Sequence, residues 1–323
     1  MKEYRRKTAR AAHLPSFVEP QLALLKKSVP TGGRWLHEIK YDGYRTICRI
    51  ESGKVQLLTR GGHDWTEAYG NLATDLKAIP VKHALFDGEI IWPDREGRPD
   101  FQGLQNALSN EASTGFVYCV FDLLFLNGED LRERPLIERK DLLKSLLDRV
   151  KKPSIQFSQH FRDVGQELLD QSCQLRLEGI ISKDSEAPYV SGRTPAWQKI
   201  KCSERQEFVV GGYIDSESAG RGIRSLLMGV FVNGKLKYAG KVGTGFNAKS
   251  QAELQRKLKR LHAETSPFDV NSPRSRNIRW VKPKLVVDVR FAAWTGDGII
   301  RHGSFQGLRD DKPAEKVRKE IAR

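Results

Sequence analysis

A lysine that could act as a nucleophile lies in the segment 38–45, which reads EIKYDGYR. The spacing Lys-x-Asp-Gly-x-Arg puts an acid, a flexible glycine and a cation close to the Lys40 amine. An amine with the ordinary lysine pKa of about 10.4 is almost entirely protonated at neutral pH, so attack needs neighbours that favour the neutral form. We expect Arg45, Lys199, Lys201 and a bound divalent metal to supply that positive charge. Taken alone, the Lys, Asp and Gly of this segment also fit an ordinary turn with solvated charges.

Acidic residues in apolar surroundings supply a second part of the predicted site. Glu89 lies in the apolar run 84–92, and Glu178 stands at the start of the run 178–183. An acid in such a position is costly unless it binds a cation or accepts hydrogen bonds. Mg²⁺ takes hard oxygen ligands and usually only one or two from protein, so we predict a metal site at Glu89 and Glu178 for Mg²⁺, with Mn²⁺ as an alternative ion.

Two further patterns are open to more than one interpretation. Residues 197–201 alternate, so Lys199 and Lys201 share one face of a strand. Two lysines on one face repel each other unless they meet phosphate, although a solvent-facing edge strand would also tolerate them. Phe121 lies in the apolar run 117–126, where a role as a buried core aromatic explains it equally well.

The elements that position these residues form an α+β pattern. We expect a strand ahead of Lys40 that turns at Asp42-Gly43. A hairpin turn at 51–54 should lead into a returning strand, 55–60, that brings Arg60 beside Lys40. Three helices are predicted in this part of the chain, at 65–76, 136–150 and 168–177.

Beyond residue 202 the predicted elements are short strands with glycine turns and a single helix. The strands are 207–213, 226–232, 235–242 and 286–293, with a turn at Asn233-Gly234 between the second and the third, and the helix is 251–262. This pattern fits a small β-barrel of the OB type, a fold that commonly binds nucleic acid strands. The predicted division of the chain is a basic arm at 1–16, a larger domain at 17–202 and the barrel at 203–323.

The charge of the chain favours a polyanionic partner. Its 323 residues carry a net charge of +15. Residues 203–323 hold 24 Lys and Arg against 13 Asp and Glu, a balance of +11, which leaves +4 for the longer N-terminal part. This concentration of positive charge is typical of a nucleic-acid-binding surface, although a basic protein is sometimes merely a soluble one.

Cysteine usage and hydropathy indicate an intracellular protein that does not enter a membrane. The four cysteines, Cys48, Cys119, Cys173 and Cys202, show no Cys-x-x-Cys spacing, so we expect reduced core thiols and no zinc site. The longest apolar runs fall far short of the roughly 20 residues that span a bilayer, and no signal peptide follows the basic N-terminus.

Taken in order, the motifs resemble those of the ATP-dependent DNA ligases, members of the covalent nucleotidyltransferase superfamily. The matching segments are Lys40–Arg45, Arg60-Gly61, Asp87–Glu89, Phe121-Asp122, Glu178–Lys183, Lys199–Lys201 and Arg309–Lys312. The segments 17–23 (FVEPQLA), 241–246 (KVGTGF) and 301–312 (RHGSFQGLRDDK) resemble in particular the ligase domain of bacterial ligase D. The resemblance implies an adenylation domain with antiparallel sheets and flanking helices at 17–202, followed by an OB-fold domain at 203–323.

The resemblance also implies a role for each matching residue, with ATP as the nucleotide. Lys40 would take AMP onto its side chain, Phe121 would stack on adenine, and Glu38 with the Ile39 backbone would read the edge of the base. Glu89 would hold the ribose and the metal, and Glu178 the metal. Arg45, Lys183, Lys199 and Lys201 would neutralise phosphates, and Arg60 would be a further cofactor-binding residue. Arg309 and Lys312 would orient the leaving pyrophosphate when the barrel closes about a hinge near 201–206.

The implied function is sealing of nicks with a 3′-hydroxyl and a 5′-phosphate, in DNA repair and end joining. The expected partners are nicked or broken double-stranded DNA and a Ku-type end-binding protein, and the expected state is a monomer in the bacterial cytoplasm, associated with the nucleoid. An RNA ligase or a capping guanylyltransferase would share Lys40, Glu89 and Glu178. A non-catalytic, basic nucleic-acid-binding protein is the third alternative.

Overall fold

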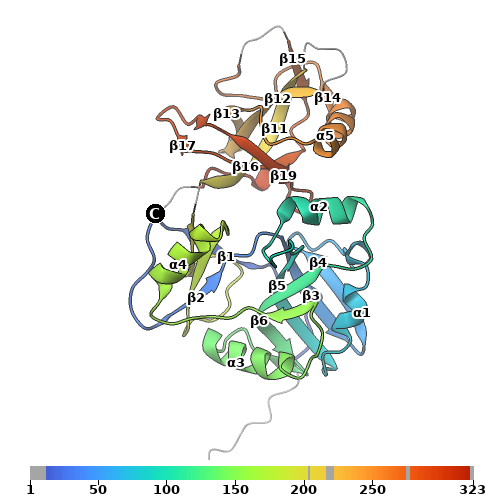
Figure 1. Cartoon of the computed structure of the whole chain (residues 1–323), viewed down its shortest axis with the longest axis vertical. Helices are drawn as coiled ribbons and strands as arrows, with labels where there is room; N and C mark the ends of the chain where they lie inside the picture. Colours follow the sequence, from blue (N-terminus) through green and yellow to red (C-terminus); the bar gives the residue numbers. More distant parts are fainter. Residues whose placement is uncertain (1–11, 203, 216–221, 274–276, 321–323) are drawn as a thin grey trace, which may run out of the picture.

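The computed structural model describes residues 12–202, 204–215, 222–273 and 277–320 of the chain. Figure 1 shows two parts, one formed by the strands β1–β10 and the other by the strands β11–β19. The predicted basic arm at 1–16 falls largely on residues 1–11, which lie outside the described residues. Among the helices that the structure describes, none has the length and apolar character needed to cross a lipid bilayer.

The first part contains two sheets. One sheet has the order β1 (Gln21–Leu25), β10 (Gly192–Lys201), β9 (Gly179–Asp184) and β2 (Trp35–Ile39). The other has the order β4 (Lys54–Thr59), β3 (Tyr44–Glu51), β5 (His83–Ile91), β6 (Val117–Leu126) and β7 (Glu129–Asp130), with β8 (Ile155–Phe157) beside β6. Most strand pairs are antiparallel as predicted, but β1 with β10 and β6 with β8 are parallel.

Alternation along the strands separates two hydrophobic cores. Ile47 of β3 and Leu85 of β5 point into a core that also contains Trp197 of the other sheet. Their neighbours Cys48 and Phe86 point to the opposite face, where the helices pack. The helices of this part are α1 (Leu72–Leu76), α2 (Phe101–Ser109), α3 (Leu136–Leu147) and α4 (Gly165–Gln174), with a 3-10 turn at Glu67–Tyr69.

The second part is the predicted barrel-like domain with one helix, α5 (Ala248–Arg260). Its main sheet contains β11 (Arg205–Asp215), β12 (Ile223–Val232), β13 (Lys235–Val242), β14 (His262–Ala263), β15 (Ile278–Val281), β16 (Val286–Arg290) and β19 (Ser304–Leu308). A small hairpin pairs β17 (Ala293–Trp294) with β18 (Ile300–Arg301), and a 3-10 turn follows at Ala314–Lys316. Leu254 and Leu258 of α5 are fully buried against the sheet, as the helical period predicts.

The structure confirms the predicted hairpins and overturns the predicted turn after Lys40. Strand β3 returns as β4 through Ser52 and Gly53, which both have positive φ as a two-residue hairpin requires. In contrast, β2 and β3 do not pair with each other, because β2 pairs with β9 in one sheet and β3 pairs with β4 and β5 in the other. Lys40 therefore lies on a crossover between sheets.

Two more features differ from the sequence predictions. Helix α2 was not predicted, although Asp100 caps it by accepting from the Gly103 backbone N–H. The expectation of four reduced thiols was wrong for two of them: Cys173 at the end of α4 and Cys202 after β10 form a disulfide, while the other two cysteines are free and buried. The pair is 29 residues apart in the sequence, and only the packing of α4 on the sheet brings the two side chains together.

Candidate active site

Lys40 lies where the chain passes from one sheet to the other. Its backbone N–H donates to the carbonyl oxygen of Gly179 at 2.9 Å, which holds the end of β2 beside β9. A Cβ atom at Gly43 would overlap the carbonyl oxygen of Ile90, so the absence of a side chain lets this segment approach β5 closely. The Lys40 side chain is only 21% exposed, and it lines a cavity rather than standing in open solvent.

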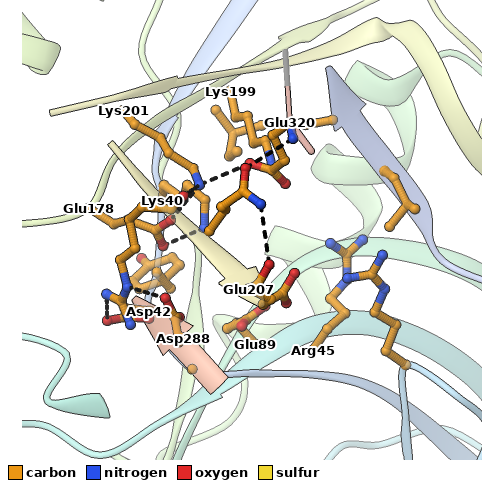
Figure 2. A pocket seen from close by; sticks show the side chains of 18 of the residues that line it. Lys40, Asp42, Arg45, Glu89, Glu178, Lys199, Lys201, Glu207, Asp288 and Glu320 are labelled. Carbon is orange, nitrogen blue, oxygen red and sulfur yellow. Dashed lines mark hydrogen bonds and ion pairs between the residues drawn. The ribbon is translucent and has the colours of Figure 1, made fainter. Parts of the chain in front are cut away.

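The cavity around Lys40 has a volume of ≈ 160 Å³ and gathers most of the predicted site residues. They are Lys40, Arg45, Arg60, Glu89, Glu178, Lys199, Lys201, Arg309 and Lys312. Figure 2 shows the side chains of Lys199 and Lys201 converging on Glu320, with Lys40 beside Glu178. Segments that are far apart in the sequence thus meet in one polar pocket.

The nearest charged partner of the Lys40 amine is an acid rather than a cation. Lys40 Nζ lies 2.5 Å from Glu178 Oε2, and Lys201 Nζ lies 3.7 Å from Glu178 Oε1. Burial opposes ionisation of Glu178, but the two ammonium groups overcome it and lower the pKa of Glu178 to about 2. The predicted cations Arg45, Lys199 and Lys201 line the same cavity. Attack by the Lys40 amine requires that its contact with Glu178 be broken.

Glu89 and Glu178 fit a site for a hard divalent cation. Burial raises the pKa of Glu89 to about 7, despite the positive charges of Lys40 and Arg45 nearby, and Glu89 forms no ion pair with any residue that the structure describes. A buried carboxylate of this kind gains from a bound cation. No group of three or more acids, histidines or cysteines with metal-binding geometry occurs among the described residues.

A smaller cavity adjoins the first and contains the residues predicted to bind the base. It is lined by Glu38, Ile39, Lys40, Phe121, Lys183 and Trp197, among others. Lys183 Nζ lies 4.2 Å from the ring centres of both Phe121 and Trp197. Burial lowers the pKa of Lys183 to about 8. Lys183 does not line the larger cavity with Lys199 and Lys201, so its predicted contact with phosphate stays a prediction.

The carboxylate of Glu38 is already bound by protein groups. Glu38 accepts from Lys140 Nζ at 2.8 Å, from Ser158 Oγ at 2.8 Å and from Lys183 Nζ at 3.0 Å. These donors hold the carboxylate in the wall of the smaller cavity. The observed contacts make Glu38 an anchor for two lysines, and recognition of adenine by Glu38 stays a prediction.

Arg45 is oriented by a buried acid. Its guanidinium donates to both oxygens of Asp87, at 2.5 and 2.6 Å, and Tyr189 donates to the same carboxylate at 2.6 Å. Arg45 Cζ lies 4.5 Å from the ring centre of Phe121. The bidentate pair fixes the plane of the guanidinium, and so Arg45 enters the cavity in one orientation.

The C-terminal part supplies the opposite wall of the cavity. Arg309 donates to both oxygens of Asp311 at 2.9 Å, and to the carbonyl oxygen of Gly43 at 3.4 Å. Lys312 forms an ion pair with Glu207 of β11. Arg309 and Lys312 therefore line the same cavity as Lys40, and we call this arrangement of the two parts closed.

Sequence reasoning missed several residues of the site. Arg205 bridges the two parts, with Nη1 2.5 Å from Asp42 Oδ2 and Nε 2.9 Å from Asp288 Oδ1. Glu207 could have been found by the signal that marked Glu89, an acid inside an apolar strand. No local pattern marks Glu320, which lies in a charged stretch with no apolar period.

Comparison with known proteins identifies the family. The model for the "ATP dependent DNA ligase domain" matches residues 20–201, and that for the "ATP dependent DNA ligase C terminal region" matches residues 219–312. The chain is 41% identical over 309 residues to the multifunctional non-homologous end joining protein LigD of Pseudomonas aeruginosa, which covers 94% of this chain and 37% of that protein. The LigD protein of Mycobacterium tuberculosis is 36% identical over 290 residues, covering 88% of this chain and 37% of the relative.

A solved structure agrees with the sequence comparison. The mycobacterial DNA ligase D complexed with ATP and MES has a TM-score of 0.65 and 34% identity, covering 93% of this chain and 98% of that one. The chain spans little more than a third of the length of the two LigD relatives. The matched family models, the sequence identity and the shared fold together show that this chain belongs to the family of ATP-dependent DNA ligases.

Proposed function

We propose that this chain seals nicks in double-stranded DNA through a lysyl-AMP formed on Lys40, with residues 17–202 as the adenylation domain and 203–323 as the OB-fold domain. The observation that supports this most is the position of the Lys40 amine, in a cavity with Glu89, Glu178 and cations from both parts of the chain. Such a pocket fits the triphosphate of ATP, whose charge the cations would neutralise.

The proposed first step forms one bond and breaks one. The neutral Lys40 amine attacks the α-phosphorus of ATP, so that an N–P bond forms, the P–O bond to pyrophosphate breaks and the amine releases a proton. Lys199, Lys201, Arg309 and Lys312 line the cavity and would hold the phosphates. Mg²⁺, or Mn²⁺ in its place, would be held by Glu178 and Glu89 and would supply further positive charge against the phosphate oxygens.

Two further transfers would complete sealing. An oxygen of the 5′-phosphate at the nick attacks the phosphorus of lysyl-AMP and releases Lys40. The 3′-hydroxyl then attacks the 5′-phosphorus, forming the phosphodiester and releasing AMP. The net charge of +11 over residues 203–323 supports binding of the DNA backbone by the OB-fold domain.

Sealing of defined substrates tests the proposal. With ATP and Mg²⁺, the protein should join a nick that carries a 5′-phosphate and leave one that carries a 5′-hydroxyl. Comparison with nicks that have RNA on either side, and with capping of a 5′-diphosphate transcript by GTP, separates a DNA ligase from an RNA ligase or a guanylyltransferase. Preferred joining of RNA, or transfer of GMP to the transcript, would contradict the proposal.

We further propose a role in bacterial non-homologous end joining, in the cytoplasm at the nucleoid. The LigD relatives carry that function in their names. The expected form is a monomer that works with a Ku-type end-binding protein. Joining of linear DNA ends should rise when a bacterial Ku-type protein is added, while sealing of a nick should not; equal effects on both substrates would contradict this role.

A further inference from the structure

A carboxylate from the C-terminal segment forms ion pairs with the two lysines that are proposed to bind phosphate. Glu320 Oε1 lies 2.6 Å from Lys199 Nζ, and Glu320 Oε2 lies 3.2 Å from Lys201 Nζ. Figure 2 shows both lysine side chains pointing at this carboxylate inside the cavity that holds Lys40. Without an anion between them, the two ammonium groups on one strand face would repel each other.

The segment that carries Glu320 is fixed to the C-terminal part. Val317 is fully buried in the core of that part, and its carbonyl oxygen accepts from the Phe231 backbone N–H at 2.9 Å. The Glu320 backbone N–H donates to Gln206 Oε1 at 3.0 Å. The carboxylate is thus held by the C-terminal part against two lysines of β10.

The charge state of these groups agrees with ion pairing. Burial opposes ionisation of Glu320, but Lys199 and Lys201 overcome it and hold the pKa of Glu320 well below its usual range. Glu320 is therefore an anion at neutral pH. Burial lowers the pKa of Lys199 to about 8, which still leaves most of this lysine protonated near pH 7. Glu320 and Glu178 then supply two negative charges among the three ammonium groups of Lys40, Lys199 and Lys201.

A phosphate group of ATP needs the same two cations. The geometry points to Glu320 as a positioning residue of the adenylation step: its carboxylate holds Lys199 and Lys201 before the nucleotide binds, yields them to the phosphates of ATP, and takes them again when pyrophosphate leaves. Glu320 therefore competes with both polyphosphates, and its return to the lysines opposes reversal of the adenylation. This inference rests on the proposed function.

Neutralising Glu320 should strengthen binding of both polyphosphates. In Glu320→Gln, the ATP concentration that gives half the maximal rate of adduct formation should fall by about tenfold, as expected for the loss of one charged hydrogen-bonding competitor. The pyrophosphate concentration that discharges half of the pre-adenylated protein should fall by a similar factor. A purely structural role for Glu320 would instead raise both concentrations, because the lysines would lose their support.

Matched variants keep the test decisive. Glu315→Gln removes the same charge from an exposed position of the same segment and should change neither concentration. Glu320→Asp shortens the acid and should shift both concentrations in the same direction as Glu320→Gln but by less; it carries the test if the glutamine variant does not fold. If wild type forms no adduct, the proposed function fails. If wild type forms the adduct and the Glu320 variants leave both concentrations unchanged or raise them, the inference is overturned.

Discussion

At the scale of single residues, the site consists of charges whose partners are already in place. Glu178 is shared by Lys40 and Lys201, and Lys199 is neutralised by Glu320. Burial raises the pKa of Glu89 to about 7, and no cation lies within ion-pair distance of it among the described residues. Burial also raises the pKa of Asp42 in this cavity, but Asp42 pairs with Arg205. The structure thus singles out Glu89 as the acid with most to gain from a bound metal or ribose.

The raised pKa of Glu89 predicts that the nucleotide-free protein loses stability as pH rises. Between an unfolded pKa near 4.5 and the folded value of about 7, the folded state binds more protons than the unfolded state, so the free energy of unfolding falls across this window. Glu89→Gln removes the effect. Relative to this variant, wild type should therefore lose roughly 1–3 kcal/mol of unfolding free energy between pH 5 and pH 8.

Urea unfolding of wild type and Glu89→Gln at the two pH values measures the difference. Glu133→Gln changes an exposed acid and should have the same free energy of unfolding as wild type at both pH values. A wild-type protein that gains stability over Glu89→Gln as pH rises would show that Glu89 is not held in a desolvated environment.

At the scale of elements, helix α3 stabilises the wall of the smaller cavity through a contact with Glu38. Lys140 projects from this helix and is fully buried; it donates to Glu38 at 2.8 Å and to the Ser158 carbonyl oxygen at 3.1 Å. Lys140→Ala leaves Glu38 without one of its donors. Removal of one partner from a buried ion pair should lower the free energy of unfolding by about 3–5 kcal/mol.

The same helix offers the control for this prediction. Lys144 makes an exposed pair with Asp148 one turn along the helix, and Lys144→Ala should cost about 0.5 kcal/mol or less. Chemical denaturation of both variants gives the comparison. Equal losses for Lys140→Ala and Lys144→Ala would mean that the buried pair does not stabilise the wall of the site.

Residue patterns within one segment were sufficient to predict the elements that depend only on neighbouring residues. The hairpin turns at Ser52-Gly53 and Asn233-Gly234 were predicted correctly because these residues adopt the positive φ that such turns need. The pairing of β2 with β9 depends on residues about 140 positions apart, as in Leu36 opposite Lys183. No residue pattern around Lys40 indicates that β2 pairs with β9, and so a turn was predicted where the chain crosses between the sheets.

The same distinction between local patterns and contacts of distant segments applies to the site. The predicted residues that line the main cavity were found because their motifs resemble a known family, and the structure brings these motifs together. Arg205 and Glu320 pair with residues of this cavity, and Lys140 pairs with Glu38 of the smaller one. All three lie outside the motifs and are recognised only when the packed elements place a charge of opposite sign beside each one.

At the scale of the whole molecule, the two parts enclose the cavity and Arg205 joins them. Its guanidinium contacts Asp42 of the first part and Asp288 of the second. Arg205→Gln should slow formation of the lysyl-AMP adduct by about tenfold or more, because the closed arrangement loses a buried ion pair. Sealing of a nick that already carries AMP on its 5′-phosphate should slow less, since that step does not need the pyrophosphate-binding residues.

Single-turnover rates of the two steps test this role of Arg205. Arg279→Gln, which breaks an exposed pair with Asp215 within the C-terminal part, should leave both rates unchanged. Thermal unfolding should confirm that the Arg205 variant is folded. Equal slowing of both steps in a folded Arg205→Gln protein would contradict a specific role in closure.

The distribution of charge over the whole chain predicts that sealing depends on salt. Phosphate contacts release counterions, so sealing of a nick at limiting protein should fall by at least about tenfold between roughly 50 and 200 mM salt. Adduct formation with ATP takes place inside a cavity and should change much less. Sealing that is insensitive to salt would argue against the basic C-terminal part as the surface that holds DNA.

The central claim is that the Lys40 amine carries the nucleotide. After incubation with ATP and Mg²⁺, digestion and mass spectrometry should locate AMP on the peptide that contains Lys40, and Lys40→Ala should carry none, while a change of the exposed Lys54 to Ala should leave the adduct intact. AMP found on another lysine, or an adduct that persists in Lys40→Ala, would contradict the account.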